Sequence, residues 1–118
     1  MTLSREAIAE AFSGHRFADA YPHLVEEVRW NLVGADTLTG RQAVVDACEG
    51  TLRELAQTAT RFPKFRTIVG ADAVVVDSVG EYQAPDGSTS TVASCDIFDF
   101  AGDSVVGITS YTTELSVE

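Results

Sequence analysis

The sequence predicts an α+β domain in which helices cover one face of a curved, mainly antiparallel sheet. Apolar residues recur at helical spacing in the first half of the chain, whereas from residue 65 onward they alternate with polar residues. Turn-forming residues at 84–87 and 101–103 separate the last three strands, so we expect these strands to form consecutive antiparallel hairpins. No linker or repeat interrupts the pattern, and residues 1–118 are therefore expected to form a single domain.

Two helices are expected before the first strand. Ser4 can cap the first helix, and Leu3 and Ile8 stand at the spacing of a hydrophobic staple. Gly14 is expected to end this helix, because glycine is the residue favoured just past a helix C-terminus. A short second helix is expected over residues 17–24.

A strand over residues 25–34 and a long helix are expected next. Thr39 and Gln42 have the spacing of a capping box, which predicts that the long helix begins there. Pro63 is expected to close this region. The apolar face of the long helix is formed by Val44, Cys48, Leu52, Leu55 and Ala59. Four strands then complete the order helix, helix, strand, long helix, four strands.

The composition excludes several classes of protein. The net charge of −10 and the sequence pI near 4.4 argue against a nucleic-acid or anionic-membrane partner, since both would repel this surface. No stretch approaches the roughly 18 apolar residues of a membrane span. The charged N-terminus does not resemble a secretory signal. Cys48 and Cys95 fit no zinc or disulfide spacing, so we expect reduced thiols in a cytoplasmic protein.

An aspartate stands in the middle of an apolar strand, "VASCDIFDF" at residues 92–100. Alternation places Asp96 on one face with Phe98 and Phe100, and places Asp99 on the opposite, solvated face. If the helices leave a gap over this face, Asp96 lines an apolar pocket, where burial raises the pKa of a carboxyl and suits it to acid–base chemistry. The structural alternative is that Asp96 binds a backbone amide or pairs with Arg29.

Nearly the whole chain resembles the nuclear transport factor two-like superfamily, whose members form an α+β cone of the cystatin type. The resemblance lies in "VRWNLVG…LTGRQAV" (residues 28–44) and "SCDIFDFAGDSVVGITSYTTEL" (residues 94–115). The superfamily includes ketosteroid isomerases, SnoaL-like polyketide cyclases and limonene-epoxide-hydrolase-like proteins. The resemblance implies a pocket inside the cone.

Matching each catalytic set of the superfamily to this chain assigns different residues. Against ketosteroid isomerases, Asp96 falls on the acid of the oxyanion hole, Asn31 on the proton-shuttling aspartate and Ile8 on the tyrosine. Against epoxide hydrolases, Asn31 matches the water-positioning asparagine and Asp96 one aspartate, whereas Ser94 stands at the arginine and Thr112 or Thr113 at the second aspartate. Against SnoaL-like cyclases, Asp96 matches the pocket acid. Asp96 and Asn31 are therefore the candidate catalytic residues.

Other groups complete the candidate site. His15 could supply a base that Asn31 cannot, with a solvated or capping histidine as the alternative. Trp30 is expected on the opposite face from Asn31, as part of the fold. Alternation and the resemblance together predict the substrate-binding residues, which are Phe12, His15, Arg29, Val76, Ser78, Ser94, Phe98, Ile108, Ser110 and Thr112.

We therefore expect an enzyme of isomerase, cyclase or hydrolase type that acts on a small apolar compound bearing a carbonyl or hydroxyl. The alternative is a non-catalytic ligand-binding or dimerisation module. No metal or cofactor is expected, because His15 and His23 have no partners at ligand spacing. A homodimer is expected through the outer sheet face, which carries Ala93, Cys95 and Ile97.

Overall fold

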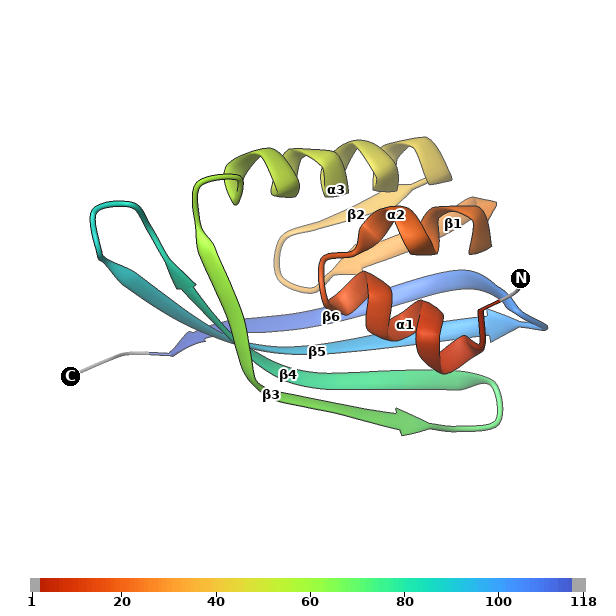
Figure 1. The fold of residues 1–118 in the computed structure, drawn as a ribbon. Coiled ribbons are helices and arrows are strands. Elements are labelled where there is room, and N and C mark those ends of the chain that lie inside the picture. Colours follow the sequence, from red (N-terminus) through yellow and green to blue (C-terminus); the bar gives the residue numbers. More distant parts are fainter. Residues whose placement is uncertain (1–2, 116–118) are drawn as a thin grey trace.

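A computed structural model describes residues 3–115 as a six-stranded curved sheet with helices on one face (Figure 1). The strand order is β2-β1-β6-β5-β4-β3. β1 and β6 run parallel, and the other neighbouring strands are antiparallel. The predicted α+β class and the mainly antiparallel sheet are confirmed.

The elements follow one another along the chain as Figure 1 labels them. The helices are α1 (Arg5–Ser13), α2 (Phe17–Ala20), a 3-10 turn (Tyr21–His23) and α3 (Arg41–Glu54). The strands are β1 (Leu24–Leu32), β2 (Asp36–Thr39), β3 (Ala59–Val69), β4 (Ala73–Gln83), β5 (Thr89–Ala101) and β6 (Ser104–Leu115). None of the helices among the described residues is both long and apolar enough to cross a membrane.

The first helix begins as its sequence predicts and packs its apolar stripe against the sheet. The Ser4 side chain accepts a hydrogen bond from the Ala7 amide at 3.0 Å, and Leu3 packs against the core. Ile8 and Phe12 are buried on the sheet side of α1, which contacts β3, β4 and β5. α3 lies against β1 and β2, so the two long helices cover different halves of the concave face.

Several details of the sequence prediction were wrong. Ala59 does not belong to the long helix, because α3 ends at Glu54 and Ala59 begins β3. The expected helix over residues 17–24 is α2 followed by the 3-10 turn, and the short strand β2 was missed. Thr39 does not cap α3, because it ends β2 and Gly40 occupies the N-cap without a side-chain hydrogen bond. Gln42 instead donates to Asp46. Pro63 lies inside β3, within the register shift between Arg61 and Lys64. Proline is tolerated there because no N–H is required from it for pairing with β4.

The core lies between the helices and the middle strands. Phe98 and Phe100 of β5, Val74 and Val76 of β4, and Val105 and Ile108 of β6 are buried against the helices. Leu24, Val28, Val44 and Cys48 extend this core under α3. The predicted inward face of the "VASCDIFDF" strand is confirmed at Phe98 and Phe100. Toward the C-terminal ends of α1 and α3 the helices and the sheet separate and leave a cavity between them.

Candidate functional site

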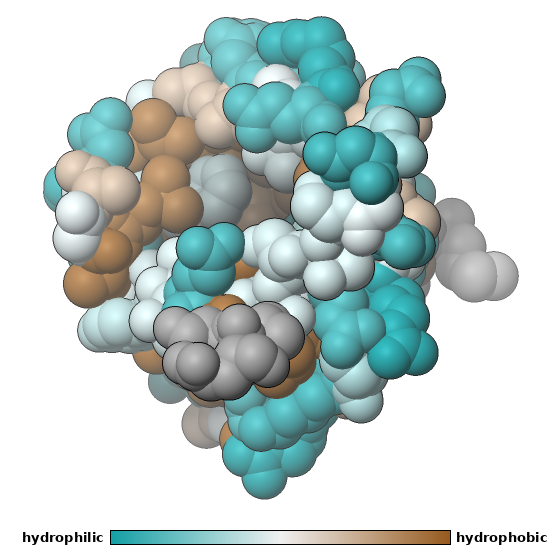
Figure 2. All heavy atoms as spheres, turned by 90° about the vertical axis from the view of Figure 1, so that its left-hand side faces the viewer, coloured by the Kyte–Doolittle hydropathy of each residue, from teal (hydrophilic) through white to brown (hydrophobic). Residues whose placement is uncertain are grey.

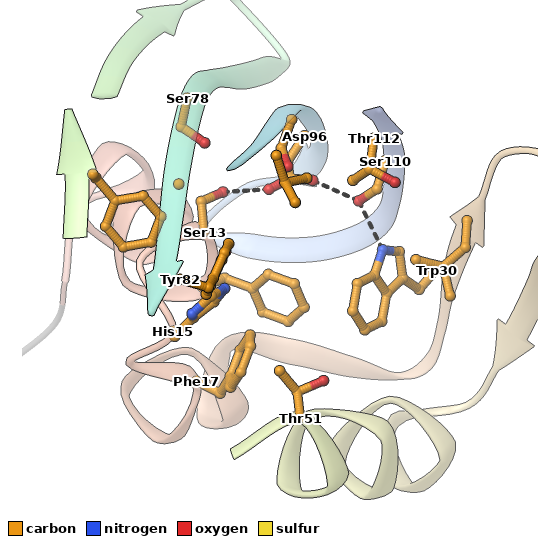
Figure 3. A pocket seen from close by; sticks show the side chains of 16 residues that line it. Ser13, His15, Phe17, Trp30, Thr51, Ser78, Tyr82, Asp96, Ser110 and Thr112 are labelled. Carbon is orange, nitrogen blue, oxygen red and sulfur yellow. Dashed lines mark hydrogen bonds between the residues drawn. The ribbon is translucent and has the colours of Figure 1, made fainter. Parts of the chain in front are cut away.

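A cavity of about 190 Å³ lies between the sheet and the C-terminal ends of α1 and α3. Figure 2 looks at this end of the molecule and shows a recess with hydrophobic residues along its left side. The cavity is lined by Phe12, Ser13, His15, Phe17, Trp30, Leu32, Thr51, Phe62, Ser78, Gly80, Tyr82, Val92, Ser94, Asp96, Ser110 and Thr112 (Figure 3). No Lys or Arg is among these lining residues, and Asp96 is the carboxylate among them.

Asp96 is held by two serine hydroxyls from different elements. Ser13 at the end of α1 donates to Oδ2 at 2.7 Å, and Ser110 of β6 donates to Oδ1 at 2.6 Å (Figure 3). The Trp30 indole donates to the Ser110 hydroxyl at 2.9 Å. Because an indole N–H can only donate, Ser110 accepts from Trp30 and has its own hydrogen available for Asp96. In this arrangement Oδ1 of Asp96 acts as an acceptor.

The surroundings of Asp96 favour its neutral form. Burial raises the pKa of the carboxyl above its ordinary value of 3.8, and this effect exceeds the lowering by hydrogen bonds from Ser110 and Ser13 and by the nearby His15. The structural alternative of an ion pair with Arg29 is wrong, since Arg29 is exposed and outside the lining of this cavity. A buried carboxyl without a cationic partner is suited either to donate a hydrogen bond or to take a proton.

His15 faces the cavity from the turn after α1. Its ring lies 5.4 Å from that of Phe17, 5.5 Å from that of Phe62 and 6.0 Å from that of Tyr82. Burial lowers the pKa of His15 below 6.5, and the negative charge of Asp96 opposes this in part. The imidazole is therefore mainly neutral at pH 7. Burial and Asp96 together raise the pKa of Tyr82, which keeps its phenol protonated.

Aromatic rings form most of the remaining wall. Phe12 lies at the centre, with edge-to-face contacts to Phe17 and Trp30 at 5.1 Å and to Phe98 at 5.6 Å. These packed rings leave little freedom to the side chains around Asp96. The cavity is thus an apolar, aromatic space with one acid at its floor, and it suits a small molecule that is mostly apolar.

The structure divides the predicted site residues into three groups. Those that line the cavity are Phe12, His15, Ser78, Ser94, Asp96, Ser110 and Thr112. Val76, Phe98 and Ile108 belong to the buried core. Arg29 and Asn31 are exposed and line a separate hollow with Thr37 and Asp99, so the expectation that they face the pocket is corrected.

The wrong face was assigned to β1. Trp30 and Leu32 line the cavity, whereas Arg29 and Asn31 point away from it. Alternation was correct, but the resemblance was used to choose the face. The apolar alternation of Val28, Trp30 and Leu32 is the signal in the sequence that identifies the inner face.

Further lining residues were missed by the sequence prediction. Phe17, Phe62 and Thr51 come from α2, β3 and α3, and no local pattern marks them as neighbours of Asp96. Tyr82 lines the cavity, while Tyr111 is 51% exposed. Among residues 3–115, no group of three His, Cys, Asp or Glu side chains could hold a metal ion.

Comparison with known proteins places the fold and the family. Residues 5–108 match the family model of the SnoaL-like domain. An NTF2-like protein of unknown function from Cytophaga hutchinsonii is similar in structure, with TM-score 0.78, 27% identity and coverage of 90% of this chain and 93% of that chain. No protein with a curated description matches this chain.

Two more distant structures share the fold. A LEH-like epoxide hydrolase from M. tuberculosis has TM-score 0.70 and 14% identity, covering 92% of this chain and 82% of its own. A candidate polyketide cyclase from Xanthomonas campestris pv. campestris has TM-score 0.70 and 17% identity, covering 89% of this chain and 84% of its own. At these identities the likeness establishes the fold alone, and the predicted resemblance to the NTF2-like superfamily is confirmed.

Proposed function

Since the chain belongs to the SnoaL-like domain family, we propose that its cavity carries out acid–base chemistry on a small, mostly apolar compound bearing a carbonyl or hydroxyl oxygen. Asp96 is the acid–base group. The observation that carries the proposal is a carboxyl with a raised pKa, oriented by Ser13 and Ser110 inside an aromatic cavity. Such a group can donate a hydrogen bond to a substrate oxygen near neutral pH, or take up the proton that a reaction releases.

The lining favours proton relocation, as in an isomerase or cyclase, over the activation of water for hydrolysis. An aspartate that must activate water needs a partner to position the water and to balance charge. The position that matches the arginine of the epoxide hydrolases is Ser94, and the second acid matches Thr112 or Thr113. All three residues are uncharged, and Ser94 and Thr112 line the cavity. Asn31, which matches the water-positioning asparagine, lies outside the cavity.

Charge also restricts the substrate. A carboxylate in the ligand would lie near Asp96 without a lysine or arginine among the cavity-lining residues to neutralise it. Burying an ionised carboxylate without a cationic partner costs several kcal/mol, even when the neighbouring acid is neutral. The preferred substrates are therefore neutral.

The test uses the single tryptophan of the chain, Trp30, as a reporter in the cavity wall. We expect cyclohexanone to change the Trp30 fluorescence and cyclohexanecarboxylate, an anion of similar size, to leave it unchanged. Exchange of the hydrogens next to the carbonyl, followed by NMR in D2O, should be accelerated by the protein. Asp96→Asn should reduce this acceleration by about 10²–10⁴-fold.

Asp99→Asn is the matched control, because Asp99 lies on the same strand but is exposed on the other face. It should exchange cyclohexanone at the wild-type rate. A wild-type rate in Asp96→Asn, or stronger binding of the carboxylate than of the ketone, would overturn the proposal.

A non-catalytic ligand-binding module is the second candidate function. It is favoured by Ile8, which is 1% exposed in the core, and by Asn31 outside the cavity, since these positions match two catalytic groups of the ketosteroid isomerases. Ketone binding without any accelerated exchange would support this second function.

A further inference from the structure

The turn after α1 places histidine where a helix end normally has glycine. The Arg16 amide donates to the Ala11 carbonyl at 2.8 Å and the His15 amide to the Phe12 carbonyl at 3.1 Å. These two bonds define a Schellman end, whose left-handed residue is usually Gly or Asn. Here that residue is His15, with φ 66°, and it is the one non-glycine residue with positive φ among residues 3–115.

Glycine is present in this turn, but one position earlier. A Cβ at Gly14 would lie 2.9 Å from the Glu10 carbonyl oxygen, so close packing requires glycine there. No such crowding requires histidine at position 15, and a left-handed conformation costs a side-chain-bearing residue free energy. The strained backbone is therefore best explained by what the imidazole does.

The imidazole is placed between the cavity and the outside. His15 and Phe62 line the cavity that contains Asp96, and both also line an adjoining hollow with Leu52, Leu55 and Ala56. Protons can thus reach the ring from solvent on one side and from a bound molecule on the other. Phe17, Phe62 and Tyr82 surround the ring and hold its orientation.

We propose that His15 is the second proton-transfer group of the cavity, a base that works with Asp96 as the acid. This inference rests on the proposed acid–base function and names the partner that it requires. Two groups in one cavity, an acid and a neutral base, allow a proton to leave one atom of a substrate while another atom gains one.

For a ketone, the step balances without an oxidant or reductant. His15 takes a proton from the carbon next to the carbonyl and becomes an imidazolium, and the C–H electron pair becomes the carbon–carbon double bond. The carbonyl π electrons move to oxygen, which takes the proton of Asp96. The enol then returns its O–H proton to Asp96 while His15 gives a proton back to carbon. The substrate class is therefore a neutral carbonyl compound with an acidic C–H beside the carbonyl.

The titratable groups that share the cavity with His15 are Asp96 of β5 and Tyr82 of β4. α3 and β3 contribute uncharged residues, Thr51 and Phe62 to the cavity and Leu52 to the outer hollow. Asp96 should therefore be the main electrostatic partner of the imidazole. When Asp96 is ionised, its negative charge raises the pKa of His15.

The test combines NMR titration of the two histidines with ketone exchange in D2O. His15→Asn removes the base while keeping a residue that tolerates positive φ, and His15→Gly relieves the backbone altogether. We expect both variants to lose about 10²-fold or more of the cyclohexanone exchange. His15→Gly should also require more urea to unfold than wild type, which a role limited to packing would not predict. His23→Asn is the matched control and should exchange as wild type does.

The outcomes separate this inference from the proposed function. Exchange that is lost in Asp96→Asn and in both His15 variants supports the pair. Exchange that is lost in Asp96→Asn but retained in His15→Asn overturns the inference and leaves the proposed function intact. A measured His15 pKa well above its ordinary value of 6.5 also overturns it, because an imidazolium at neutral pH cannot take a proton. Cyclohexanone binding without exchange in wild type overturns the proposed function, and this inference with it.

Discussion

Replacing Asp96 with asparagine should stabilise the fold near neutral pH. Burial raises the pKa of Asp96 in the folded state above its ordinary value of 3.8, so the folded protein holds this proton more tightly than the unfolded chain does. The stability associated with the neutral carboxyl is fully present below pH 3.8 and is lost as the pH rises through the folded-state pKa. Asparagine is neutral at every pH, so the variant does not lose this stability as the pH rises.

The structure determines the size and the limits of this effect. Between the two pKa values the wild type loses about 1.4 kcal/mol of unfolding free energy per pH unit, while the variant loses none from this position. Asparagine can keep both contacts, since its oxygen can accept from Ser110 and its amide can donate to the Ser13 hydroxyl. The advantage of the variant should therefore grow above pH 3.8 and become constant above the folded-state pKa.

Urea unfolding at closely spaced pH values from 3 to 8 measures this difference, with Trp30 fluorescence and circular dichroism as signals. Asp99→Asn serves as the control, because Asp99 is exposed and its removal should give no such growing difference. A variant that is less stable than wild type at pH 7, or a difference that shrinks as the pH rises, would refute the assignment of Asp96 as a buried acid with a raised pKa.

Three other perturbations test separate parts of the structure. Ser110→Ala removes a hydrogen bond to the Asp96 carboxyl and leaves the Trp30 N–H unpaired, so the pKa of Asp96 should rise further and the free energy of unfolding should fall by about 1–3 kcal/mol. Ser94→Ala is the control. A lowered pKa of Asp96 in carbon NMR of Ser110→Ala would contradict this prediction. Gly80→Ala would place a Cβ 2.8 Å from the Tyr82 hydroxyl oxygen, so the Tyr82 ring should move and the free energy of unfolding should fall by about 1 kcal/mol. Cyclohexanone binding, followed by Trp30 fluorescence, should weaken. Unchanged binding would argue against Tyr82 as part of the cavity wall. We also propose a homodimer through the outer sheet face, where Ile68, Val75 and Ile97 form a cross-strand apolar row. Ile97→Lys should give monomers in sedimentation experiments in which the wild type gives dimers. A wild-type monomer at micromolar concentration would refute the proposed dimer.

Local patterns were sufficient for most elements of the fold. Alternation in residues 92–100 gave the inner face of β5, and Ser4 marked the start of α1. Where these predictions failed, a tertiary contact had replaced a local preference. Thr39, expected to cap α3, is instead the last residue of β2, a strand that is stable only because it pairs with β1.

The candidate site could be predicted only in part. Alternation identifies which residues of a strand share a face, and in β1 the apolar residues Val28, Trp30 and Leu32 mark the buried one. The prediction instead followed the resemblance, which selected the face of Asn31. The hydrogen bond of the Trp30 indole could not be predicted from local patterns, because its partner Ser110 is 80 residues away in the sequence. Asn31 was predicted to face the pocket, and Trp30 to face away from it, because the resemblance was used to choose the inner face of β1.

By itself, the sequence determined an acidic α+β domain with one acid on the apolar face of a central strand. Only the tertiary structure decided what surrounds that acid. Ser13 and Asp96 are separated by 83 residues, and no local pattern relates them. Hydrogen bonds, burial and pKa depend on distances in space, whereas the patterns in a sequence report periodicity along the chain. For the same physical reason, the left-handed backbone of His15 and its enclosure by aromatic rings became visible only once the chain was folded.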